Sequence, residues 1–425
     1  MNKWLYITAF FLSKVSLAQL PSSTGLAQLQ NEQNSQVKQN NNAVIHHQNN
    51  SAKSYLEVEN IKAEAKKEKV KPVKASQYRF VDVNSPAYKA NSSYYTDAYS
   101  TLNKMLSSDT GLSIKRGVYV IENAYMEKKL PYDKYLSLIQ KKVSLVKYIL
   151  KKEKLDEANP DAIHYAIQKL YLDTLYFKQA NGTMKMVKPL RYDFNNPFGE
   201  DEQLVTKLLV TGKGQCHSMP LLYMILCEEF NIKSYVAYSP QHSFIKFQTK
   251  NGTWYNFETT NGHLTTDAFI FGSGFIKSEA LKSGIFNTPQ NSKQVLANMF
   301  IDLANNYQEK FGYDDFQQKC VEKNLQYNTN YVYAKVVRSN YQTALTDLAL
   351  AQEGYPNPKY IPQYPYISQM FQTRNEYYKE LDNLGFTNMP QDAYMKWISS
   401  LKEGQEKQNS QELQDQFQNT VNLKK

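Results

Sequence analysis

Two glycines and a cysteine stand directly ahead of a strongly apolar stretch. Gly212 and Gly214 permit a tight backbone approach, and Cys216 precedes an apolar run that continues to Phe230. This pattern predicts a helix that opens at Cys216. A thiol in that position faces unpaired backbone N–H groups and the positive end of the helix dipole, which favours the reactive thiolate. Because the helix is apolar on nearly all sides, we expect it to be central and rigid.

A histidine and a carboxylate follow on two predicted strands. His242 begins one alternating run, and Glu258 lies near the end of the next. A two-residue loop at Asn251-Gly252 would place these two side chains on opposite faces of the hairpin. A three-residue loop with a left-handed Gly252 would instead make Glu258 the same-face diagonal neighbour of His242. Only the second register assembles cysteine, histidine and carboxylate, so a two-residue turn would exclude the triad.

The motifs around these residues resemble a known family. Gly214-Gln215-Cys216 is followed by a histidine that opens a strand and then by Trp254-Tyr255-Asn256-Phe257-Glu258-Thr259-Thr260, as in the transglutaminase-like superfamily. The resemblance covers roughly residues 200–340 and is strongest over 207–262. It is closest to a bacterial branch in which tetratricopeptide-like helices follow the core. It implies a papain-like core, with the cysteine at a helix start and its two partners on neighbouring strands.

The resemblance implies acyl transfer at amide bonds. Cys216 and His242 match the family's nucleophile and base, and Glu258 falls where the family usually has aspartate. Cys216 would form a thioester, His242 would hold the thiolate and protonate the leaving amine, and Glu258 would fix the ring. Water as second nucleophile would make the protein a peptidase or amidase, whereas an amine would make it a transamidase. We expect a peptide or protein amide as substrate and no cofactor.

Three more residues are candidates to line a substrate cleft. Gln215 and His217 flank the predicted nucleophile, and Trp254 begins the strand that carries Glu258. His217 departs from the family, because many members carry an aromatic residue after the cysteine.

Two other interpretations of the site remain open. Cys216, His217, His242 and His263 are metal-ligating residue types, but their spacing matches no common zinc pattern, and we expect no metal. Alternatively, the fold is catalytically silent and serves as a protein-interaction module with a vestigial cysteine. The enzyme interpretation predicts rapid alkylation of Cys216 at neutral pH. The module interpretation predicts an ordinary thiol and a protein partner bound on the helical flanks.

The first residues predict export. Lys3, the apolar run from Trp4 to Leu12 and the small residues of Ser16-Leu17-Ala18 are typical of a signal peptide over 1–18. The apolar run is too short to span a bilayer. Residues 19–76 are rich in Gln, Asn, Ser and Lys and predict a disordered, low-complexity leader. We therefore expect a periplasmic or extracellular protein with no membrane span after signal removal.

The basic charge of the chain lies mostly in these first segments. The formal net charge is +10 over 425 residues, but only +5 of it falls within residues 77–425. A nucleic-acid partner is therefore not expected. Three cysteines are too few for a disulfide scaffold, and Cys227 and Cys320 are predicted to be buried in the core.

The remaining segments predict helices around a small mixed core. His164 falls inside a helical run that Asn159 would cap, and we interpret it as a packed helix residue. Around Tyr307 and Phe316 the pattern resembles one tetratricopeptide unit, although an ordinary helical hairpin explains it equally well. The predicted fold class is α+β, with a central helix that carries the cysteine against a small antiparallel sheet. The expected regions are helical over 77–200, core over 201–285, helical and tetratricopeptide-like over 286–401, and a polar, frayed tail over 402–425.

Overall fold

The computed structural model describes residues 86–108, 111–178, 182–194, 203–272, 275–400 and 405–422. The predicted signal peptide and leader lie outside the described residues. The described chain divides into two compact units, of which the smaller comprises residues 341–378 and the larger comprises the rest. The larger unit combines helices with small sheets, which agrees with the predicted α+β class. Among the described residues, no helix is both long and apolar enough to cross a membrane.

Four helices begin the larger unit. Asn159 accepts a hydrogen bond from the Asp161 backbone and caps the fourth helix, as predicted, while Ser113 caps the second. Proline at the first position of a helix is favourable because its missing N–H would be unpaired there in any case. That residue here is Pro160. The four helices are α2 Pro86–Ser107, α3 Ile114–Tyr125, α4 Tyr132–Lys152 and α5 Pro160–Leu172.

Strands replace part of the predicted helical region. β1, Leu175–Lys178, pairs antiparallel with β2, Met184–Val187. β3, Arg191–Tyr192, pairs parallel with β4, Lys213–Gly214. The expectation that helices continue to residue 200 was therefore wrong. Three- and four-residue spacing of apolar side chains ends with α5, and short apolar runs beyond it pair with each other or with the chain ahead of Cys216.

The main sheet has four antiparallel strands in the order β5-β6-β7-β8. Between β6 and β7, Gln248 is the partner of Trp254, and the Thr249 backbone N–H donates to the Thr253 carbonyl at 3.0 Å. The loop therefore has three residues, and Gly252 adopts a left-handed φ of 90°. Of the two registers that the sequence left open, this is the one that places His242 and Glu258 on one face, as the triad requires. The strands are β5 Tyr235–Ser239, β6 His242–Gln248, β7 Trp254–Glu258 and β8 His263–Thr265.

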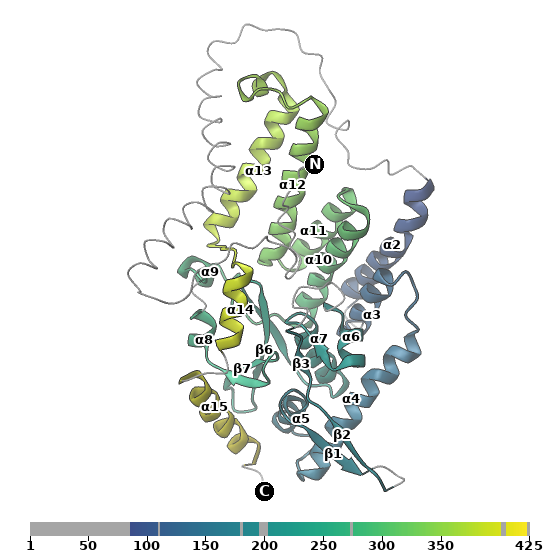
Figure 1. The fold of residues 1–425 in the computed structure, drawn as a ribbon, viewed down its shortest axis with the longest axis vertical. Coiled ribbons are helices and arrows are strands. Elements are labelled where there is room, and N and C mark those ends of the chain that lie inside the picture. Colours follow the sequence, from purple (N-terminus) through teal and green to yellow (C-terminus); the bar gives the residue numbers. More distant parts are fainter. Residues whose placement is uncertain are drawn as a thin grey trace. The chain divides into compact units, whose positions relative to one another are not determined.

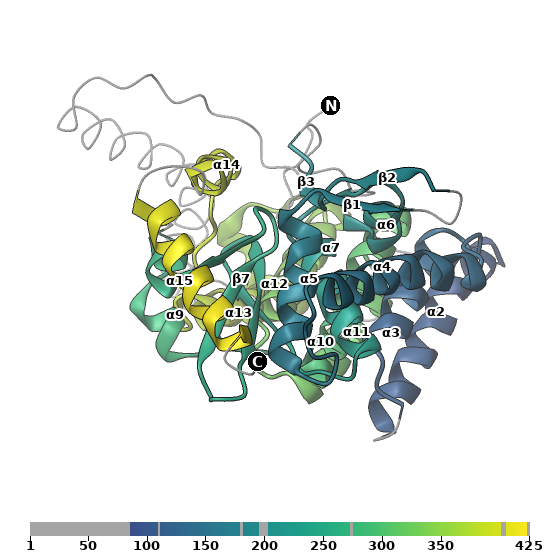
Figure 2. The ribbon, with the colours of Figure 1, turned by 90° about the horizontal axis from the view of Figure 1, so that it is seen from below.

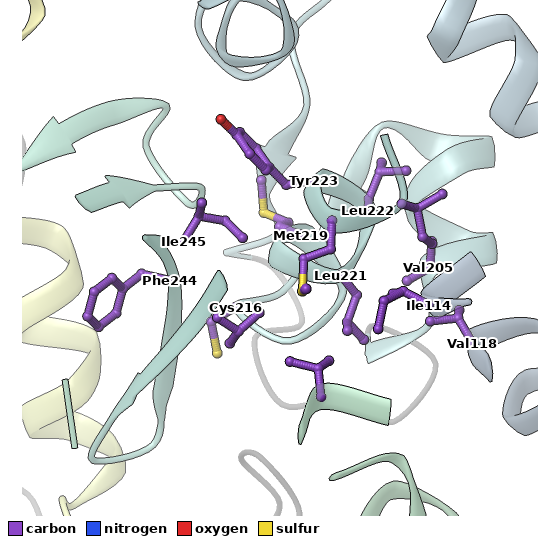
Figure 3. Packing of buried hydrophobic residues seen from close by; sticks show 14 of the residues in the cluster. Ile114, Val118, Val205, Cys216, Met219, Leu221, Leu222, Tyr223, Phe244 and Ile245 are labelled. Carbon is purple, nitrogen blue, oxygen red and sulfur yellow. The ribbon is translucent and has the colours of Figure 1, made fainter. Parts of the chain in front are cut away.

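Helix α7, Ser218–Glu229, lies at the centre of the larger unit. Its first ten residues, Ser218 to Cys227, are all buried. Figure 3 shows Met219, Leu221, Leu222 and Tyr223 packed among side chains from the preceding helices and from β6. Cys227 belongs to the core as predicted, and burial raises the pKa of its thiol to about 12.

A helical layer packs against α2 and α3. α10, Ser292–Phe311, contacts α2, α3 and α11, Asp315–Tyr327, as Figure 1 shows. Tyr307 packs against Phe316 with ring centroids 4.6 Å apart, and Cys320 is fully buried, as expected. These contacts make a helical hairpin, and its relation to tetratricopeptide repeats stays a prediction.

Helix α12, Val332–Gln352, continues from the larger unit into the smaller one. The smaller unit also holds η3, Pro358–Gln363, and most of α13, Pro365–Asn383. Its core consists of four buried apolar side chains, Ala349, Ile361, Ile367 and Met370.

Two helices after α13 return to the larger unit. α14 spans Gln391–Ser400, and α15 spans Gln405–Asn422. Figure 2 shows α15 beside β7, where Phe417 packs against Phe247 and Tyr255 at centroid distances of 5.1 and 5.3 Å. The expectation of a frayed tail from residue 402 was therefore wrong. A few apolar residues at helical spacing, with Phe417 fully buried, are enough to dock a polar segment.

Two short helices follow the sheet, α8 Asp267–Phe271 and α9 Ser278–Lys282, and a third, α6 Val205–Thr211, precedes β4.

His164 is a buried, uncharged member of the core. Its Nε2 lies 3.1 Å from the Lys233 carbonyl, so Nε2 carries the proton, and Nδ1 accepts from the Tyr223 hydroxyl at 2.9 Å. Burial lowers the pKa of His164 to about 3. The predicted role as a packed helix residue is confirmed.

The stability of the chain should fall in acid because of His164. In the unfolded chain His164 binds a proton below its ordinary pKa of about 6.5. In the folded chain it stays unprotonated until about pH 3. Because of His164, we expect the free energy of unfolding to fall by about 1.4 kcal/mol for each unit that the pH is lowered between these limits. Urea unfolding at pH 7.0 and 4.5 should show a shallower loss for His164→Gln than for the unmodified chain. Equal losses would contradict the assignment.

Candidate active site

Cys216 lies in a tight turn immediately before α7. The Met219 backbone N–H donates to the Gln215 carbonyl at 3.0 Å, so the first hydrogen-bonded turn encloses Cys216, although the helix itself begins two residues later at Ser218. Gly214 is needed here for space, because a Cβ would lie 2.7 Å from the Ser218 hydroxyl. The expected helix start is thus correct within two residues.

Two hydrogen bonds join this turn to the beginning of β6. The Ser243 hydroxyl donates to the Cys216 carbonyl at 2.5 Å, and the Cys216 thiol lies 3.7 Å from the Gln241 carbonyl. Gln241 has a left-handed φ of 56° in the short connection between β5 and β6. This connection brings His242, the first residue of β6, next to the cysteine.

His242 and Glu258 form a direct ion pair. The His242 Nε2 atom lies 2.6 Å from Glu258 Oε2, and both side chains are fully buried. The second carboxylate oxygen accepts from the Thr260 backbone N–H at 3.0 Å and from the Thr260 hydroxyl at 2.7 Å. The carboxylate is therefore held on both sides, and the extra methylene of glutamate relative to aspartate is accommodated.

The Cys216 side chain acts on the same imidazole ring. Since Glu258 occupies Nε2, Nδ1 is the ring nitrogen that remains for the thiol. Burial disfavours the imidazolium, but the Glu258 carboxylate and the Cys216 side chain outweigh it and raise the pKa of His242 to about 10. The structure thus brings Cys216, His242 and Glu258 together in one buried row.

The three predicted cleft residues have other partners. Gln215 is buried and donates from Nε2 to the Asp193 carbonyl at 3.0 Å, which ties the cysteine turn to β3. Trp254 is the first residue of β7 and packs against Tyr235, whereas Glu258 is the last residue of that strand. His217 turns toward α10, where its Nε2 lies 3.5 Å from Asp302.

His217 borders a cavity of about 40 Å³ between α3, α6, α7 and α10. Burial disfavours the charged ring, but Asp302 and the more distant Glu122 raise the pKa of His217 above its ordinary value. Burial also raises the pKa of Glu122 to about 7, although that carboxylate accepts hydrogen bonds from the first two residues of α6, Val205 and Thr206. His217 therefore belongs to a separate polar cluster.

His263 opens β8 and stands opposite Glu258 in the strand pairing. Within the ranges that the structure describes, no group of three or more His, Cys, Asp or Glu side chains is arranged to hold a metal ion.

Aromatic residues that the sequence analysis did not select complete the site. The Tyr394 hydroxyl lies 3.2 Å from His242 Nδ1, and the Trp397 ring meets the His242 ring edge to face at 5.1 Å. Both residues belong to α14, which lies beside β6 in Figure 1. The Tyr192 hydroxyl of β3 donates to the Met395 sulfur of the same helix at 3.9 Å. Tyr394 and Trp397 are three residues apart on a predicted helix, and this spacing indicates that they share one face of the helix. Nothing in the sequence indicates which part of the protein that face covers.

The site is closed in this conformation. Cys216, His242, Glu258 and Tyr394 each have an exposed fraction of 0%. Comparison with known proteins gives no assignment: no family model, curated protein or solved structure matches this chain.

Proposed function

We propose that this protein is a cysteine enzyme that acts on amide bonds through a thioester. The observation that carries the proposal is the row from the Cys216 thiol through His242 to Glu258, with the carboxylate 2.6 Å from Nε2. A carboxylate on one ring nitrogen fixes the tautomer and favours the imidazolium, which can then hold a thiolate on the other nitrogen.

The proposed reaction has two halves. The Cys216 sulfur attacks the carbonyl carbon of an amide, and His242 passes its Nδ1 proton to the leaving nitrogen, so that an amine departs and a thioester remains. Water or a second amine then attacks the thioester and gives up a proton to His242, and the thiolate is restored. Glu258 keeps the ring oriented in both halves and stabilises its charged form.

Two features support a transglutaminase-like, papain-like core as the frame for this chemistry. The cysteine precedes a buried helix, and its partners lie at the start of β6 and at the end of β7, in the order that the sequence resemblance implies. A peptide or protein amide substrate, the peptidase-or-transamidase alternative and export of the chain belong to the same proposal.

A second candidate function is a catalytically silent interaction module. The observation that favours it is the complete burial of the row, because a substrate carbonyl needs access to the sulfur. In this case the His242–Glu258 pair would be a structural ion pair, and a protein partner would bind on the helical flanks.

The dependence of Cys216 alkylation on His242 separates the two candidates. The double variant Tyr394→Ala, Trp397→Ala, which removes the two α14 side chains that contact His242, is treated with iodoacetamide at pH 6, with or without His242→Gln, and adducts are counted by peptide mass spectrometry. We expect the loss of the imidazolium to slow the modification of Cys216 about 100-fold, since the thiolate is the reactive form.

The matched control is His164→Gln. His164 also lies near a thiol, with Nδ1 4.0 Å from the Cys227 sulfur, but it is uncharged and distant in the sequence from the site. This change should leave the alkylation of Cys216 unaltered. If His242→Gln and His164→Gln react alike at Cys216, the proposed enzyme is wrong and the interaction module is favoured.

A further inference from the structure

One short segment of the chain, residues 388–398, covers His242 at the site. It includes Asn388 and Met389 and the first eight residues of α14. Tyr394, Trp397 and Ile398 are the buried residues of this helix, while Asp392 and Lys396 are exposed. The helix therefore contributes mainly one buried face, and that face lies on the catalytic row.

The Tyr394 hydroxyl occupies the position that a reacting group needs. It lies 3.2 Å from His242 Nδ1, and burial together with the nearby Cys216 side chain raises the pKa of this hydroxyl. In the proposed reaction the leaving nitrogen must lie between the same sulfur and the same ring nitrogen to receive the proton. Tyr394 and a substrate therefore exclude each other.

The rest of the segment is held in the way that a peptide is recognised. The Gln241 side-chain amide donates to the Met389 main-chain carbonyl and, at 2.9 Å, to Asn388 Oδ1. Trp397 stacks on Phe269 with ring centroids 5.3 Å apart, and its indole N–H donates to the Phe269 carbonyl at 3.4 Å. A main-chain contact together with an aromatic pocket gives affinity and side-chain selection, as in peptide-binding grooves.

Both flanks of the segment are anchored independently of it. Before it, Glu380 pairs with Lys335 at 2.6 Å and with Arg338. After it, Phe417 of α15 is fully buried against β6 and β7. The segment can therefore leave the row without detaching its neighbours.

We propose that residues 388–398 are a tethered occupant of the substrate site that keeps the enzyme closed. The site that they vacate takes a peptide with two aromatic side chains three residues apart, in the places of Tyr394 and Trp397. This assignment of substrate class rests on the proposed function. The covering of the site by residues 388–398 does not depend on it.

Accessibility of Cys216 tests the closure without requiring turnover. Iodoacetamide alkylation at pH 8 should be at least tenfold faster in the double variant Tyr394→Ala, Trp397→Ala than in the unmodified chain. Lys396→Ala, outside the buried face of the same helix, should react like the unmodified chain. An unchanged rate in a double variant with a cooperative thermal transition would overturn the proposal.

A peptide added in trans tests the occupancy. A synthetic peptide of residues 386–400 should slow alkylation of the double variant at least fivefold, and the same peptide with alanine at both aromatic positions should not. Equal protection by the two peptides would overturn the aromatic selection. Rapid alkylation of the opened chain that does not depend on His242 would retain the closure while rejecting the enzyme, so the two failures are distinguishable.

Discussion

Replacing Glu258 with glutamine is expected to discharge His242 at neutral pH. The carboxylate 2.6 Å from Nε2 is the main reason that the pKa of this buried ring is raised to about 10. Without it, burial dominates, and the pKa of His242 should fall below its ordinary value of about 6.5. Cys216 then loses its cationic partner, and the free energy of unfolding at pH 7 should drop by about 4 kcal/mol.

Ring-proton NMR of His242 against pH measures this change directly. The unmodified chain should hold the charged ring to about pH 10, and its stabilising contribution should be complete below pH 6.5 and lost as the pH rises through 10. Thr260→Val is the matched control, because it removes one hydrogen bond to the carboxylate but leaves the charge. A ring that stays protonated at pH 8 in Glu258→Gln would contradict the ion-pair assignment.

Gly262→Ala is expected to lower the free energy of unfolding by about 3 kcal/mol or more. A side chain in the left-handed conformation costs about 1–2 kcal/mol, and overpacking adds about 1–3 kcal/mol. Gly262 has a φ of 79°, and a Cβ there would lie 2.6 Å from the Tyr171 carbonyl oxygen, a backbone atom that cannot rotate away. Its N–H also donates to the Glu258 carbonyl at 2.9 Å. The strain therefore falls on the turn that follows the catalytic carboxylate.

Gly212→Ala separates the two causes. Gly212 is left-handed with a φ of 73°, but no atom lies within 4 Å of the place that a Cβ would occupy, so only the backbone penalty applies, about 1–2 kcal/mol. Urea unfolding of both variants should show the difference. If the two losses are equal, the close contact with Tyr171 has no energetic effect.

The sequence was sufficient for the part of the site that depends on local geometry. The glycines before Cys216 predict a tight turn, and the residues around Gly252 reduce the hairpin to two registers, of which only the three-residue loop places Glu258 on the face of His242. Both follow from backbone rules that act over a few residues. The structure agrees with each, with the helix beginning at Ser218 instead of Cys216.

What the sequence did not reveal depends on contacts between distant segments. Tyr394 lies 152 residues from the histidine that it contacts, and it is one of 33 tyrosines in the chain. Phe417 lies in a segment whose polar composition predicts fraying. Its burial could not be predicted, because it depends on a sheet formed far earlier in the chain. The polar partners of Gln215 and His217 are likewise set by packing of β3 and α10, which no local pattern encodes.

The position of Phe417 also bears on when the protein matures during synthesis. Its ring covers Phe247 and Tyr255, on the two strands that carry His242 and Glu258. Helices α5 and α7 cover the same face of the sheet beside Phe247 and precede it in the chain, whereas α15 leaves the ribosome long after the strands. A nascent or truncated chain that lacks α15 would therefore expose the sides of Phe247 and Tyr255 that Phe417 covers. Burial of this apolar surface thus depends on a helix that is synthesised long after the strands themselves.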